Sequence, residues 1–145
     1  MAATSRADAT WEGDLVSGSG HVKPESGAFP ELPISWASRA ERQHGKTSPE
    51  ELIAAAHASC YCMAFSSGLA KAGHKPERLD TKAEIEFVPG TGITTATLTV
   101  RGHVHGISND EFQKLAEAAK EGCPVSQAMH GNVELRLHAT LDAAH

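Results

Sequence analysis

The chain has 145 residues, of which 40% are hydrophobic and 21% charged, and its formal net charge is −5 at pH 7. This length and composition predict one soluble globular domain, residues 1–145. The negative charge and the lack of a basic run argue against a nucleic-acid partner. Aromatic residues are few, with two Trp, one Tyr and four Phe. The core must therefore be largely aliphatic, and a lean core in a small domain favours a homo-oligomer.

The cellular compartment is predicted from the first 20 residues, the longest apolar segment and the number of cysteines. Residues 1–20 contain no apolar stretch, so we expect no secretory signal. The longest apolar-rich segment, 52–65, is interrupted by His57 and Ser59, and it is shorter than the roughly 20 residues that a bilayer crossing needs. Three cysteines cannot all pair within one chain, which fits a reducing compartment. We therefore expect a cytoplasmic protein without a membrane partner.

The first predicted elements are short strands. Residues 9–27 hold extended pieces that are broken by Gly and Ser, a pattern typical of a hairpin or meander. Residues 29–47 have no clean hydrophobic period, and we expect a long loop there. A loop of that length in a small domain is commonly functional or disordered. This one carries Arg39, Glu41 and Arg42.

A helix is predicted next, over residues 48–73. Ser48 and Glu51 have the spacing of an S-x-x-E capping box, and Pro49 suits the first helical position. Gly73 is the residue type that commonly follows the end of a helix. The helix therefore carries His57 and two of the three cysteines.

The rest of the chain is predicted to hold two strands joined by a Pro-Gly turn, a helix, a short helical segment and a final strand. In chain order these are 83–88, 93–105, 108–122, 123–129 and 133–141. The strands are predicted from alternating apolar and polar residues, and the longer helix from apolar residues three and four apart. This order of elements predicts the α+β class, with antiparallel sheet packed on helices.

The cysteines raise the question of chemistry. Cys60 and Cys62 are two positions apart, about 200° around a helix axis, so only one of them can belong to a site on a given face. Packing as small buried hydrophobic residues is the alternative for both. Cys123 stands at the start of a helical turn, where a helix N-terminus stabilises a thiolate. Cys60 needs a nearby cation to ionise, and His57, three residues earlier, has the spacing of a Cys–His pair. A buried His57 that binds the backbone or faces a partner is the alternative.

Nine histidines raise a metal hypothesis. His103 and His105 lie on one face of a predicted strand, and with a third ligand they would suit zinc. That face is the polar one, and an exposed histidine pair is the commoner explanation. We therefore expect no metal site and no bound cofactor.

Two cysteine motifs, in this order and spacing, resemble a known family. "SPEELIAAAHASC" at 48–60 and "GCPVSQAM" at 122–129 are similar to the OsmC/Ohr family of organic hydroperoxide reductases. "TWEGDLVSGSGHV" at 10–22 resembles the OsmC branch, and the resemblance covers nearly the whole chain. It implies a thiol-dependent peroxidase with an α+β OsmC-like fold. In that fold antiparallel β-sheets pack around central helices in an intertwined homodimer, with the sites at the subunit interface.

The resemblance also implies roles for individual residues. Cys60 matches the peroxidatic cysteine and Cys123 the resolving cysteine. Glu50 matches the family's carboxylate, and Arg39 matches its arginine. The loop "ASRAERQHGK" departs from the family pattern and is one residue longer, so Arg42 is a second candidate for the arginine.

The implied chemistry is reduction of an organic hydroperoxide by a thiol pair. The Cys60 thiolate attacks the peroxide, and the sulfenic acid that results condenses with Cys123 to a disulfide. A guanidinium stabilises the thiolate, and a carboxylate orients the guanidinium. A dithiol reductant, of the lipoyl type in this family, then restores both thiols. Cys62 matches no motif position, and we expect it to face away from the site.

Helix geometry predicts that two subunits share each site. Glu50 and Cys60 are ten residues apart, which is about 15 Å along a helix axis. Glu50 therefore does not reach Cys60 of its own chain through the arginine. We expect Cys60 and Cys123 of one subunit to meet the arginine and Glu50 of the other.

The substrate side is expected to be apolar, which favours alkyl or aromatic hydroperoxides over hydrogen peroxide. The expected lining residues are Leu52, Ile53, Ala55, Ala56, Met63, Phe65, Val125 and Met129. The alternative function, from a different class, is a non-catalytic stress-induced binding protein with the same fold. Such a protein has no need of both Cys60 and Cys123.

Overall fold

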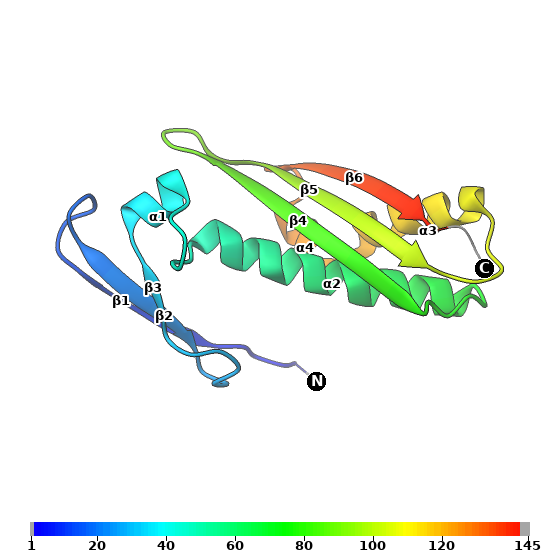
Figure 1. Ribbon diagram of the computed structural model, residues 1–145, viewed down its shortest axis with the longest axis horizontal. Coiled ribbons are helices and arrows are strands. Elements are labelled where there is room, and N and C mark those ends of the chain that lie inside the picture. Colours follow the sequence, from blue (N-terminus) through cyan, green and yellow to red (C-terminus); the bar gives the residue numbers. More distant parts are fainter. Residues whose placement is uncertain (1, 143–145) are drawn as a thin grey trace. The chain divides into compact units, whose positions relative to one another are not determined.

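The computed structural model describes residues 2–142. The chain forms two compact units, one ending at Leu52 and the other beginning at Ile53. Helix α2 (Pro49–Lys71) is continuous and crosses this boundary (Figure 1).

The first unit contains a three-stranded sheet and a short helix. The elements are β1 (Ala7–Glu12), β2 (Ser19–Pro24), β3 (Leu32–Ile34) and α1 (Trp36–Glu41). The strands follow one another in the order β1-β2-β3, and both pairs are antiparallel. The predicted N-terminal hairpin or meander is therefore confirmed.

The prediction of a loop over 29–47 is wrong, because β3 and α1 both lie within it. Helix α1 begins with a reciprocal cap, in which Ser35 and Ser38 each accept a hydrogen bond from the other's backbone N–H at 3.0 Å. A three-residue strand and a six-residue helix are too short to show a hydrophobic period. The serine pair at i and i+3 was the available signal.

The second unit packs helices on a three-stranded sheet. Besides α2 it contains β4 (Arg78–Val88), β5 (Gly92–His103), α3 (Asn109–Gly122), α4 (Pro124–Met129) and β6 (Glu134–Leu141). The strand order is β4-β5-β6, with β4 antiparallel and β6 parallel to β5. The expectation of purely antiparallel sheet is therefore wrong for β6. Helices α3 and α4 connect β5 to β6, and a connection of this kind returns the chain in the same direction.

Helix α2 begins and ends as its sequence predicts. The Ser48 hydroxyl accepts a hydrogen bond from the Glu51 N–H at 3.0 Å. The Glu51 carboxylate accepts hydrogen bonds from the Thr47 and Arg42 side chains. Gly73 adopts the left-handed conformation, with φ 90°, just beyond the last turn.

Helix α2 supplies one side of the core of the second unit. Its length and composition alone would suit a membrane crossing. Its residues Tyr61, Phe65 and Leu69, four positions apart, are however fully buried among side chains of β5 and α3. The core residues from those two elements include Leu98, Val100, Phe112, Ala116 and Ala119. Helix α2 is thus the core helix of this unit.

Candidate active site

Cys60 and Cys123 are neighbours although they lie far apart in the sequence. Cys60 lies in the fourth turn of α2, and Cys123 is the residue between α3 and α4. The Cys123 N–H donates to the carbonyl of Ala119 at 2.9 Å, so the last turn of α3 fixes its backbone. Cys123 is fully buried, whereas Cys60 is partly exposed. All three cysteines are free thiols.

The surroundings of Cys60 within the second unit do not activate it. Burial raises the pKa of the Cys60 thiol, and the neighbouring Cys123 thiol raises it further. A hydrogen bond from the backbone N–H of Val125, in the first turn of α4, acts in the opposite direction. A thiolate at Cys60 therefore needs a cation from elsewhere.

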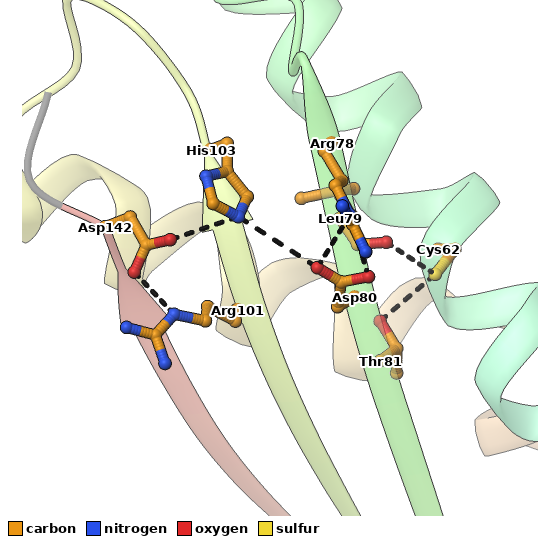
Figure 2. A network of polar contacts seen from close by, with 8 residues as sticks. All are labelled: Cys62, Arg78, Leu79, Asp80, Thr81, Arg101, His103 and Asp142. Atoms are coloured by element: carbon orange, nitrogen blue, oxygen red, sulfur yellow. Dashed lines mark hydrogen bonds and ion pairs between the residues drawn. The ribbon is translucent and has the colours of Figure 1, made fainter. Parts of the chain in front are cut away.

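Cys62 faces another part of the molecule. Figure 2 shows its sulfur directed at β4, where it lies 3.1 Å from the Thr81 hydroxyl and also contacts the Leu79 carbonyl oxygen. Cys60 instead adjoins Cys123 and the first turn of α4. The prediction that Cys60 and Cys62 serve different faces of the helix is confirmed.

The two histidines of the metal hypothesis bind different carboxylates. His103 Nε2 lies 3.0 Å from the Asp142 carboxylate, which also accepts a hydrogen bond from Arg101 (Figure 2). His105 lies beyond the end of β5, and its Nε2 is 2.9 Å from Glu77. Within residues 2–142 there is no group of three His, Cys, Asp or Glu side chains that could hold a metal ion.

The first unit holds a bidentate pair between Arg39 and Glu50. Arg39 Nε donates to both carboxylate oxygens at 3.1 and 3.2 Å, and Nη2 donates to Oε2 at 2.9 Å. The Glu50 side chain is 7% exposed and the Arg39 side chain 35%. Helix α1 supplies the arginine, and the first turn of α2 supplies the carboxylate. The buried carboxylate of Glu50 thus orients the guanidinium of Arg39.

Arg42 has a different set of partners. It caps the end of α1 with φ 58°, in the left-handed region. Its guanidinium donates to the Ser38 carbonyl, the Ser48 hydroxyl and the Glu51 carboxylate, each at 2.9 Å. Arg42 therefore ties the end of α1 to the start of α2, and Arg39 is the arginine that pairs with Glu50.

An apolar pocket of about 290 Å³ lies beside Arg39 in the first unit. It is lined by Trp11, Leu15, Ile34, Ser35, Trp36, Arg39 and Pro49. Both tryptophans of the chain belong to it, and the sequence showed no signal that the β1 and α1 residues would meet. The expectation that Phe65 lines a substrate pocket is wrong, because Phe65 is fully buried in the core.

His57 is a buried histidine whose partner is a serine. Its ring is fully buried, and Nε2 lies 2.8 Å from the hydroxyl of Ser126 on α4. Burial lowers the pKa of His57, so the ring is neutral near pH 7 and supplies no positive charge to a Cys60 thiolate. Nδ1 has no hydrogen-bond partner among the described residues. Ser126 was missed from the sequence, because a serine in a short helix carries no special pattern.

The buried His57 predicts a pH dependence of stability. The folded-state pKa lies below the ordinary value of 6.5, so below about pH 6.5 the unfolded chain binds a proton that the folded chain does not. The free energy of unfolding should therefore fall as the pH drops from 7 to 5. In His57→Gln this part of the dependence should vanish, as measured by urea unfolding at both pH values. His130→Gln, at an exposed position, controls for the loss of a histidine as such. An unchanged dependence in His57→Gln would contradict the prediction.

The fold and the site together define a class. The molecule is an α+β protein in which helices packed on a sheet hold two neighbouring thiols, with a carboxylate-bound arginine in its other unit. The family model described as OsmC-like protein matches residues 42–138. The peroxiredoxin OsmC of Escherichia coli (strain K12) is 39% identical over 138 residues, which are 93% of this chain and 96% of that protein. The chain belongs to the OsmC/Ohr family.

Solved structures share the fold. The organic hydroperoxide resistance protein OhrB of Bacillus subtilis is 25% identical with a TM-score of 0.69, over 93% of this chain and 98% of that one. An OsmC-like protein from Mycoplasma pneumoniae is 14% identical with a TM-score of 0.74, over the whole of both chains. The predicted OsmC-like α+β fold is thereby confirmed for the single chain.

Proposed function

We propose that this protein is a cytoplasmic thiol peroxidase that reduces organic hydroperoxides to alcohols. The observation that carries the proposal is the meeting of Cys60 and Cys123, because a binding protein needs no such pair of thiols. Membership of the OsmC/Ohr family supports it, since relatives are named as a peroxiredoxin and as organic hydroperoxide resistance proteins.

The proposed reaction has three steps. The Cys60 thiolate attacks the terminal peroxide oxygen, the O–O bond breaks, and the alkoxide leaves and takes up a proton as the alcohol. The Cys60 sulfenic acid then reacts with the Cys123 thiol, forming the disulfide and releasing water. An external dithiol, for which we propose a lipoyl group or a lipoylated protein, exchanges with this disulfide and is itself oxidised.

The cation that activates Cys60 is proposed to be Arg39 of the other subunit of a homodimer. The continuous helix α2 supports this, because ten residues of helix separate Glu50 from Cys60, about 15 Å along the axis. The raised pKa of Cys60 in its own unit supports it as well, since the missing positive charge must come from elsewhere. Val16 is 78% exposed and Met63 69%, and a second copy that covered these side chains would gain from their burial.

The substrate is proposed to bind through its organic group. The pocket beside Arg39 offers two indole rings and little polar surface, so an alkyl or aryl group gains from burial there, while hydrogen peroxide does not. A higher kcat/KM for hydrogen peroxide than for cumene hydroperoxide would contradict this proposal.

Thiol titration tests the proposal directly. One equivalent of cumene hydroperoxide should remove two thiols per chain from the wild-type protein, because Cys60 and Cys123 form a disulfide. Cys62→Ser is the matched control, and it should also lose two thiols, since Cys62 faces β4. Cys60→Ser should lose none at the same time point. An unchanged thiol count in the wild type would instead support the non-catalytic binding protein.

A further inference from the structure

Helix α4 is held in place through a polar residue. It has six residues, and Ser126 is its only buried side chain. A helix this short is not stable by itself, so its position depends on what it contacts. A pocket of about 220 Å³ adjoins α4, lined by Glu121, Ser126, Gln127, His130 and Leu135. The side of α4 toward this pocket is therefore incompletely packed.

The hydrogen bond between His57 and Ser126 lies next to the two thiols. On α2, His57 precedes Cys60 by three residues, which is nearly one helical turn. On α4 and its cap, Ser126 follows Cys123 by three residues. The same two segments thus meet twice, once through the polar pair at 2.8 Å and once through the thiols. Whatever fixes the first contact also fixes how Cys123 is presented to Cys60.

The buried pair of His57 and Ser126 is not the arrangement that would stabilise the fold most. Both side chains are buried, and the Nδ1 atom of His57 has no partner among the described residues. A buried polar atom without a partner is destabilising, so two apolar side chains of similar volume would hold α4 at lower cost. A hydrogen bond differs from such packing because its distance and direction fix one register between the helices.

We propose that His57 and Ser126 are positioning residues for the resolving step, which hold Cys123 where it reacts with the Cys60 sulfenic acid. This inference rests on the proposed peroxidase function. In that step the S–S bond forms, the S–O bond of the sulfenic acid breaks, and the oxygen leaves as water with the proton of Cys123. Without the hydrogen bond, α4 samples other positions and the sulfenic acid lives longer. A second peroxide then oxidises it to the sulfinic acid, which a dithiol does not reduce.

The test compares Ser126→Ala, Ser126→Thr and the wild type as reduced full-length proteins. Cumene hydroperoxide is added, and acid-quenched samples are analysed by mass spectrometry for the Cys60 sulfenic acid, the disulfide and the sulfinic acid. Ser126→Ala should form the disulfide about tenfold more slowly, as expected for loss of one buried hydrogen bond, and should accumulate the sulfinic acid. The rate at which Cys60 is first oxidised should not change. Ser126→Thr keeps the hydroxyl and should restore fast resolution.

Two controls make the outcome decisive. Gln127→Ala alters an exposed residue of the same helix and should behave as the wild type. His57→Gln keeps a hydrogen-bonding group for Ser126, and it should resolve faster than His57→Phe. Resolution in Ser126→Ala as fast as in the wild type, or an equal slowing of both steps, would overturn the proposal. A wild type that consumes no peroxide would instead overturn the proposed function.

Discussion

Replacing Cys60 by serine is expected to lower kcat/KM for cumene hydroperoxide by at least about a thousandfold, because Cys60 is the proposed nucleophile. A serine hydroxyl stays protonated near neutral pH, and its oxygen is a far weaker nucleophile than a thiolate. The measurement is a coupled assay in which a lipoyl dithiol serves as the reductant. Cys62→Ser is the control, because its thiol faces Thr81 on β4 and should be dispensable.

Cys123→Ser separates the two thiols by their roles. In this variant Cys60 should still react once with the hydroperoxide, but the sulfenic acid has no internal partner. One thiol per chain should therefore be lost in the first turnover, followed by sulfinic acid and loss of activity. Activity that survives in Cys60→Ser while it is lost in Cys123→Ser would reverse the assignment of peroxidatic and resolving cysteine.

Mixed dimers should recover activity that neither parent variant has. Arg39→Ala lacks the cation, and Cys60→Ser lacks the nucleophile, so each homodimer should be nearly inactive. If each site takes Cys60 from one subunit and Arg39 from the other, a heterodimer contains one complete site. Random mixing through unfolding and refolding should then restore about a quarter of the wild-type activity, since half of the dimers are mixed and each has one of its two sites intact.

The control for this experiment combines two variants whose changed residues are contributed to each proposed site by the same subunit. Arg39→Ala mixed with Glu50→Gln should recover nothing. Both residues of the ion pair come from one chain, so every site in the mixture still lacks one of them. No recovery between Arg39→Ala and Cys60→Ser would show that each site belongs to a single chain. Recovery in the control would show that Arg39 and Glu50 of one site come from different chains. The thiolate absorbance of Cys60 should also appear at higher pH in Arg39→Ala, since the guanidinium no longer favours the charged form.

Local signals in the sequence were sufficient where the structure obeys local rules. The sequence predicted the N-cap at Ser48, the end of the helix at Gly73 and the alternating burial of β5. These features depend on backbone hydrogen bonds and on side-chain periodicity, both of which are set by residues a few positions apart. The separation of Cys60 from Cys62 likewise follows from helix geometry alone. Elements shorter than two periods, such as β3 and α1, could not be predicted in the same way.

The direction of β6 required the tertiary structure. Its alternating residues predict a half-buried strand but are compatible with either direction. The two helices that precede it reverse the chain twice, and so β6 runs parallel to β5. The choice between Arg39 and Arg42 as the partner of Glu50 was also undecided in the sequence, because both lie in the same charged segment. At the end of α1, the Arg42 side chain donates to Ser48 and Glu51. The buried carboxylate of Glu50 is therefore paired with Arg39.

The sequence by itself determined the family and predicted Cys60, Cys123 and Glu50 as site residues, because these lie in motifs whose residues are close together in the chain. Only the tertiary structure decided which groups act on them. It pairs His57 with Ser126 across 69 positions and brings Trp11 to the pocket of Arg39. It also shows that burial makes Cys60 less acidic and keeps His57 neutral. The physical reason is that desolvation and hydrogen-bond geometry depend on neighbours in space, which no local pattern encodes.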